Sequence, residues 1–189
     1  MGRGEASKLL HIIDFGLSKR YKDLKSGKHI SLKKGQKFIG SAKYASINAH
    51  IGVEQSKRDD LESICYVIAY FLKGRLPWQE ILEENEEVKY KKIADCKNEQ
   101  TPEILFKGQP GRYCIKCLEE LVALNAYCKN LKFEEEPNYG YIHELLMKVL
   151  MKEKLECDLK FDWMLKESLS NTKFPSLVTE ENKSFKYFI

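Results

Sequence analysis

The chain has 189 residues, of which 43% are hydrophobic and 32% are charged, and its formal net charge is +4. These values are typical of one globular domain that buries roughly 70% of its unfolded surface on folding. The amino terminus lacks an apolar stretch, so we expect no secretory leader, no membrane anchor and no membrane partner. The six cysteines show no disulfide framework, and we expect reduced thiols in the cytoplasm or nucleus.

The charge is unevenly distributed along the chain. Residues 17–58 contain eleven Lys and Arg against two acids, whereas residues 80–103 contain eight acids against four lysines. A basic segment of this kind can bind phosphate on a protein or on nucleic acid, or it can be a solvated loop. Composition alone leaves these alternatives open.

The first predicted element is a short β-strand over residues 8–13, an apolar run bounded by Gly16. Asp14, Phe15 and Gly16 follow it directly, and by itself this triplet could be an ordinary strand-to-turn junction. Residues 17–44 contain few large apolar side chains and several glycines. They predict a long irregular loop, a kind of segment that often carries function.

The strongest element is a helix over residues 59–73, in which every side chain from Ile64 to Leu72 is apolar or aromatic. Ser56 and Asp59 resemble a capping box, and Gly74 predicts the end of the helix. A helix that is apolar on all sides belongs at the centre of a domain, so we predict a buried central helix.

The remaining segments predict a mainly α fold without internal repeats. Helices are expected over residues 80–95, 113–131 and 139–151, with a turn-rich connector over 101–112 and a loosely ordered tail over 167–189. Cys114 and Cys117 form a C-x-x-C motif without a second ligand pair, and we expect them to pack in the core.

Several motifs together resemble the casein kinase I family of Ser/Thr protein kinases. They are D-F-G at 14–16, S-I-N at 46–48, E-Q-S-K-R-D-D-L-E-S at 54–63 and L-P-W-Q at 76–79. The resemblance continues to Phe161-Asp162-Trp163. It implies a truncated protein-kinase-like C-terminal lobe over residues 1–166, with a short strand before D-F-G, a long activation segment and a tail over 167–189.

The resemblance also implies roles for particular residues. Asp14 would ligate the Mg²⁺ of bound ATP, with Phe15 and Gly16 completing the D-F-G cofactor motif. Asp60 would support the catalytic loop. A basic pocket made of Lys43, Lys19 and Lys37 would bind acidic or phosphorylated protein substrates. Two departures weaken this pocket: Lys43 stands where the family has an arginine, and glutamates at 83–87 stand where it tends to have lysines.

The sequence lacks other parts of a kinase active site. It contains no H-R-D motif, and Gly2 and Gly4 lack the third glycine of an ATP-binding loop. We therefore expect ATP and Mg²⁺ to serve the full-length family, and residues 1–189 alone to be inactive. Three functions stay open: part of a casein kinase I-like kinase, a non-catalytic lobe that binds a protein partner at an exposed interlobe face around Leu9, Ile12 and Phe15, and a basic nucleic-acid-binding segment. No recognised groove-reading motif supports the third.

Overall fold

The computed structural model describes residues 8–107, 118–156 and 158–159. The chain divides into two units, residues 17–155 and residues 1–16 with 156–189, and each is described by itself. The expected C-x-x-C pair, the Phe161–Trp163 motif and the 167–189 tail lie outside the described residues. The described secondary structure is almost entirely helical, which confirms the mainly α prediction.

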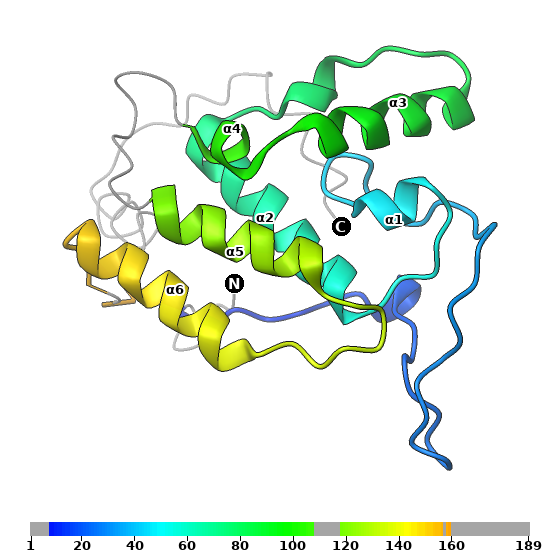
Figure 1. Ribbon diagram of the computed structural model, residues 1–189, viewed down its shortest axis with the longest axis horizontal. Helices are drawn as coiled ribbons and strands as arrows, with labels where there is room; N and C mark the ends of the chain where they lie inside the picture. The colour runs from blue at the N-terminus through cyan, green and yellow to red at the C-terminus, as the bar shows by residue number, and fades with distance from the viewer. Residues whose placement is uncertain (1–7, 108–117, 157, 160–189) are drawn as a thin grey trace, which may run out of the picture. The chain divides into compact units, whose positions relative to one another are not determined.

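Helix α2 (Lys57–Lys73) is the predicted central helix (Figure 1). Its first turn is fixed by the Ser56 N–H, which donates to Asp59 Oδ2 at 2.8 Å. The helix ends at Gly74, whose φ of 75° is the left-handed conformation that glycine adopts readily. The prediction that α2 is buried on every side is wrong, because the side chains of Ile64 and Phe71 are 49% and 74% exposed.

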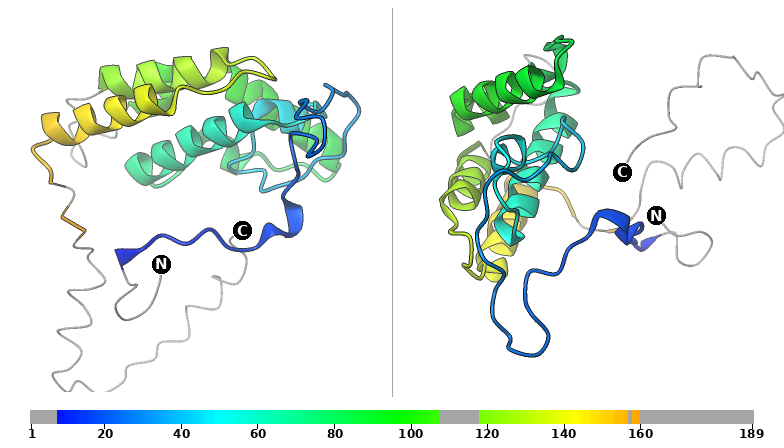
Figure 2. Two further views of the ribbon diagram at one scale, coloured as in Figure 1. Left: turned by 90° about the horizontal axis from the view of Figure 1, so that it is seen from below. Right: turned by 90° about the vertical axis from the view of Figure 1, so that its right-hand side faces the viewer.

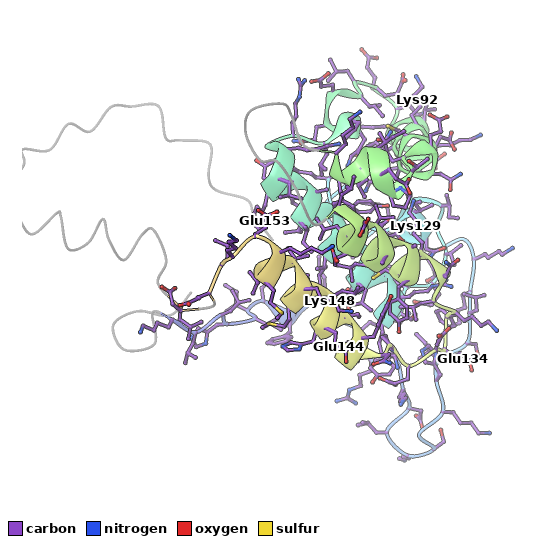
Figure 3. The ribbon with its side chains drawn as sticks, turned by 60° about the vertical axis from the view of Figure 1, so that its left-hand side comes forward. Lys92, Lys129, Glu134, Glu144, Lys148 and Glu153 are labelled. Carbon is purple, nitrogen blue, oxygen red and sulfur yellow. The ribbon has the colours of Figure 1, made fainter. Side chains whose placement is uncertain are left out.

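Helices α5 (Leu118–Asn130) and α6 (Tyr139–Lys152) lie side by side and run in opposite directions, with α2 packed against α5 (Figures 1 and 2). Asn138 begins α6, since its side chain accepts a hydrogen bond from the Tyr141 N–H. Glu144 and Lys148 on α6 are exposed to solvent (Figure 3). The bounds of α6 confirm the helix predicted over residues 139–151.

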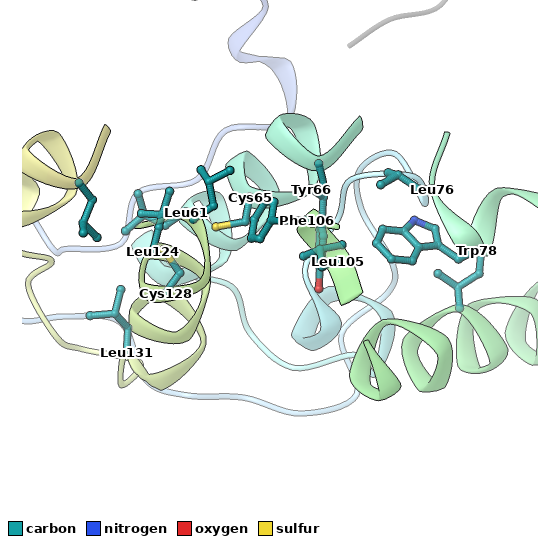
Figure 4. Packing of buried hydrophobic residues seen from close by; sticks show 14 residues of the cluster. Leu61, Cys65, Tyr66, Leu76, Trp78, Leu105, Phe106, Leu124, Cys128 and Leu131 are labelled. Atoms are coloured by element: carbon teal, nitrogen blue, oxygen red, sulfur yellow. The ribbon is translucent and has the colours of Figure 1, made fainter. Parts of the chain in front are cut away.

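The core of the helical unit lies between α2, α4 (Pro102–Phe106) and α5 (Figure 4). Tyr66 and Trp78 meet edge to face with ring centroids 5.0 Å apart, a favourable aromatic geometry. The α4 side chains Leu105 and Phe106 are fully buried. The turn-rich connector expected over residues 101–112 is wrong here, because Pro102 begins a helix, a position where proline is common.

Helix α3 (Glu86–Glu99) begins six residues later than predicted, after the 3₁₀ turn η3 (Pro77–Glu80). The Asn85 side chain caps it by accepting hydrogen bonds from the Glu87 and Val88 N–H groups. The S-I-N segment begins the short helix α1 (Ile47–His50), which Ser46 caps, and α1 packs against both α2 and α3.

The predicted strand over residues 8–13 is not formed, and only a 3₁₀ turn, η2 (Phe15–Leu17), follows it. A strand is stabilised by hydrogen bonds to a neighbouring strand. In the part of the chain that the structure describes, pairing is limited to two isolated bridges, Lys22 with His29 and Lys34 with Val53. Residues 9–13 are exposed and have no strand beside them there.

Candidate anion-binding site

Main-chain pairing brings the loop over residues 17–46 back to the start of α2. The Gln36 N–H donates to the Gly52 carbonyl, and the Glu54 N–H donates to the Lys33 carbonyl, both at 2.9 Å. Gly52 has a φ of 69°, and a β-carbon there would lie 2.8 Å from the Gln36 carbonyl oxygen. Glycine is therefore required for this close approach.

The buried carboxylate of Asp59 connects the S-I-N segment, Ser56 and the first turn of α2. It accepts hydrogen bonds from Ser46 Oγ at 2.7 Å, Asn48 Nδ2 at 3.0 Å and the Ser56 N–H at 2.8 Å. The positive end of the α2 dipole also stabilises its charge. The S-I-N segment is thus held to the first turn of the central helix.

A second buried carboxylate, Glu62, lies one helical turn further along. It accepts hydrogen bonds from the Ile47 N–H at 3.0 Å and from the Tyr66 hydroxyl at 2.5 Å. Burial raises the pKa of Glu62, and these two hydrogen bonds act in the opposite direction. Asp59 and Glu62 together fix α1 on α2.

A pocket of about 530 Å³ opens between the basic loop over residues 17–46 and the start of α2. Its charged lining consists of three lysines and two acids: Lys19, Lys37, Lys57, Glu54 and Asp60. Lys19 Nζ lies 2.6 Å from Glu54 Oε1, and Lys57 forms an ion pair with Glu136 outside the pocket lining. Among the lining residues the lysines exceed the acids by one, and two of the three lysines are already bound to carboxylates.

Asp60 faces this pocket, whereas its neighbour Asp59 faces the interior. Partial burial and the adjacent Asp59 charge both raise the pKa of Asp60. Asp60 is nevertheless exposed to solvent, which screens its charge.

Of the three lysines predicted to form one pocket, Lys19 and Lys37 line it and Lys43 does not. Lys43 Nζ lies 3.3 Å from the centroid of the Tyr70 ring and 5.0 Å from that of Tyr44, a cation–π arrangement.

The D-F-G residues are described within their own unit. Asp14 has a φ of 63°, unusual for a residue other than glycine, and its Oδ1 accepts a hydrogen bond from the Gly16 N–H at 3.1 Å. A non-glycine residue in this conformation is a feature that often marks functional sites. The backbone around Asp14 is therefore a tight turn stabilised by its own carboxylate.

These residues do not by themselves form a site for Mg²⁺ and ATP. Asp14 supplies one carboxylate, and the described parts of the chain contain no group of three His, Cys, Asp or Glu side chains able to hold a metal ion. Mg²⁺ on a nucleotide also needs phosphate-binding groups, which the sequence lacks.

Two residues of the pocket, and one buried residue outside it, were not predicted from the sequence. Glu54 and Lys57 belong to the E-Q-S-K-R-D-D run, but only the fold shows that they line the pocket. Lys97 of α3 is fully buried beside the S-I-N segment. The sequence around Lys97 did not indicate its burial, because lysines on a polar helix are usually exposed.

No family model matches the chain. None of the described helices has both the length and the apolar character required to cross a bilayer.

Proposed function

We propose that this chain is part of a casein kinase I-like Ser/Thr protein kinase and binds the acidic or phosphorylated segment of a protein substrate. The observation that carries the proposal is the pocket in which Lys19, Lys37 and Lys57 come together at the start of α2. The motifs at 14–16, 46–48 and 54–63 support the same family. In this proposal the chain contributes substrate binding, and ATP and Mg²⁺ are bound by the complete kinase.

The hydrogen bonds of the S-I-N segment support this role. Asp59 and Glu62 hold α1 on α2, so the wall of the pocket formed by residues 53–57 has a fixed position. A preformed cationic pocket binds an anion without first ordering a loop. A phosphate group has three oxygens that can each accept a hydrogen bond from a lysine ammonium.

The first prediction concerns Lys37. Lys37→Glu is expected to weaken binding of a phosphoserine peptide about tenfold, because it replaces a cation of the pocket by an anion. Fluorescence anisotropy of a labelled peptide at low ionic strength measures this change. Binding by the unaltered chain should also weaken as salt is added.

Lys28→Glu is the matched control, since Lys28 lies on the same loop but does not line the pocket. It changes the net charge equally and should leave the peptide affinity within about twofold. Equal weakening by both variants would show that binding depends on overall charge, and would contradict the proposed pocket.

The second prediction is that residues 1–189 transfer no phosphate. Phosphoryl transfer requires a positioned base and several groups that stabilise phosphate charge, and the sequence supplies only Asp14 among them. Incubation with labelled ATP and an acidic protein should give no incorporation above a protein-free blank. Incorporation that disappears in Asp14→Ala would contradict this expectation.

A second candidate function is a non-catalytic lobe that binds a protein partner. It is favoured by the exposure of Leu10, Ile12, Ile13 and Phe15, which ranges from 68% to 81%. Apolar surface of this kind often marks an interaction site. The Lys37→Glu variant distinguishes the two functions, because it should not change the affinity of a partner that binds through these apolar side chains.

A further inference from the structure

A turn at residues 22–28 projects from the helical unit (Figures 1 and 2). Its two sides are joined by the Asp23 N–H, which donates to the Lys28 carbonyl at 2.9 Å. The Asp23 carboxylate accepts hydrogen bonds from the Lys25 and Ser26 N–H groups at 3.1 and 2.7 Å. The turn therefore has a defined shape, and its one carboxylate is bound by its own main chain.

The base of this turn is packed on the helical unit. The main chains of Lys22 and His29 form an antiparallel bridge. The His29 ring meets the Phe133 ring edge to face, with centroids 4.7 Å apart, and Lys57 Nζ lies 4.7 Å from the centroid of Tyr21. Because the base is fixed by these contacts, the tip does not have to be ordered when it meets a partner.

The tip of the turn combines exposed cations with an exposed leucine. Leu24 is 75% exposed, and Lys25 and Lys28 are exposed beside it. Within the described parts of the chain, neither of these two ammonium groups forms an ion pair. We call residues 22–28 the basic turn.

An acidic surface of similar design lies before and at the start of α3. Residues 82–87 contain four glutamates and no basic residue, and we call them the acidic segment. Lys92 forms an ion pair with Glu83, whereas the other three glutamates are exposed and form no ion pair with another described residue. Leu82 is 89% exposed. The acidic segment thus also combines an exposed leucine with charges that the fold does not neutralise.

The basic turn and the acidic segment lie at opposite ends of the helical unit, as the views in Figures 1 and 2 agree. One copy of the chain therefore does not bring them together. Their charges are opposite, and each has a single leucine that water surrounds. A second copy of the chain supplies the complementary surface for each of them.

We propose that the basic turn of one copy of this chain binds the acidic segment of a second copy. Ammonium groups of the turn pair with carboxylates of the segment, and Leu24 and Leu82 are removed from water together. The two surfaces differ, so the contact is heterologous and each pair of copies still has one free turn and one free segment. Further copies therefore add head to tail. Neither surface contains a residue that lines the anion-binding pocket, so the inference does not depend on the proposed function.

The association is expected to be weak and to depend strongly on salt. Exposed ion pairs contribute little individually, and salt screens them. Sedimentation equilibrium of the full chain measures the mean mass. At about 20 mM salt the mean mass should rise above the 22.0 kDa of one copy as the protein concentration increases, and at about 500 mM salt it should return to that value.

Charge reversal tests which surfaces meet. Lys25→Glu with Lys28→Glu makes the turn acidic, and Glu84→Lys with Glu87→Lys makes the segment basic. Each pair of substitutions alone places like charges opposite each other and should raise the dissociation constant at least about tenfold. A chain with all four substitutions retains the net charge of +4 and has opposite charges on the two surfaces again, so it should associate as the unaltered chain does.

Glu99→Lys with Glu144→Lys is the matched control, because it changes the net charge as the reversed segment does but at exposed positions outside both surfaces. It should keep the dissociation constant within about threefold. Circular dichroism verifies that each variant is folded.

Three results would overturn the inference: a single mass of 22.0 kDa for the unaltered chain at low salt, association that persists in either pair of reversals, or a chain with all four substitutions that stays monomeric. Persistence would assign the contact to another surface, such as the exposed apolar side chains at residues 10–15. None of these measurements uses a phosphopeptide, so their failure would leave the pocket proposal unaffected.

Discussion

Asp59→Ala is expected to lower the free energy of unfolding by about 3 kcal/mol, because it leaves several buried donors without their acceptor. The Asp59 carboxylate binds the Ser46 hydroxyl, the Asn48 amide and the Ser56 N–H, and the residue is only 2% exposed. Removal of the carboxylate also takes a favourable negative charge from the first turn of α2. Urea denaturation followed by circular dichroism measures the change.

Asp60→Ala is the matched control, since it removes the same side chain from the next position of the same helix. The pKa of Asp60 is raised by partial burial and by Asp59, so the folded state does not stabilise its charge. We expect a change of less than about 1 kcal/mol. Equal destabilisation by the two variants would contradict the different environments that the structure assigns to them.

The second large effect is a loss of stability in acid that depends on His50. Burial, assisted by the charge of Lys97, lowers the pKa of His50 to about 3 from its ordinary value of 6.5. The unfolded chain therefore binds a proton first as pH falls. The contribution of His50 is fully present above about pH 6.5, decreases as pH falls towards 3, and amounts to about 4 kcal/mol over the window.

His50→Phe tests this expectation, because it retains an aromatic ring for stacking on Phe38, whose centroid lies 4.9 Å away. The quantity compared is the slope of unfolding free energy against pH, which should be lower in the variant by up to about 1.4 kcal/mol per pH unit between pH 4 and 6. Glu62, whose pKa is raised, acts with the opposite sign in both proteins. Identical slopes would show that His50 is accessible to protons in the folded state.

Local signals were sufficient for elements whose ends are encoded nearby. Gly74 ended α2 as predicted, and α6 followed the predicted range because Asn138 caps it. The same signals were misread at Pro102, which begins α4 rather than a turn. The apolar run at residues 8–13 was not sufficient to predict a strand, because such a run forms a strand only beside another strand.

The candidate site was less predictable because its members meet through distant contacts. Lys37 reaches the pocket through pairing near Gly52, and Lys19 is held there by Glu54. Lys43 lies on a tyrosine that follows it by 27 residues, and no periodicity in its own segment indicates this partner. The resemblance to the kinase family indicated the three basic residues, and the fold determined which of them share a pocket.

The ion pairs of the pocket lysines have a consequence for selectivity. Lys19 is bound to Glu54, and Lys57 is bound to Glu136, so an entering ligand must compete with two carboxylates. A singly charged ligand group exchanges one carboxylate contact for an equivalent one and gains little. A dianionic phosphate can accept hydrogen bonds from both ammonium groups at once and gains from its higher charge. In the proposed substrate-binding role, the resident carboxylates would thus make the pocket discriminate phosphoserine from aspartate or glutamate by charge density, although all three are anions.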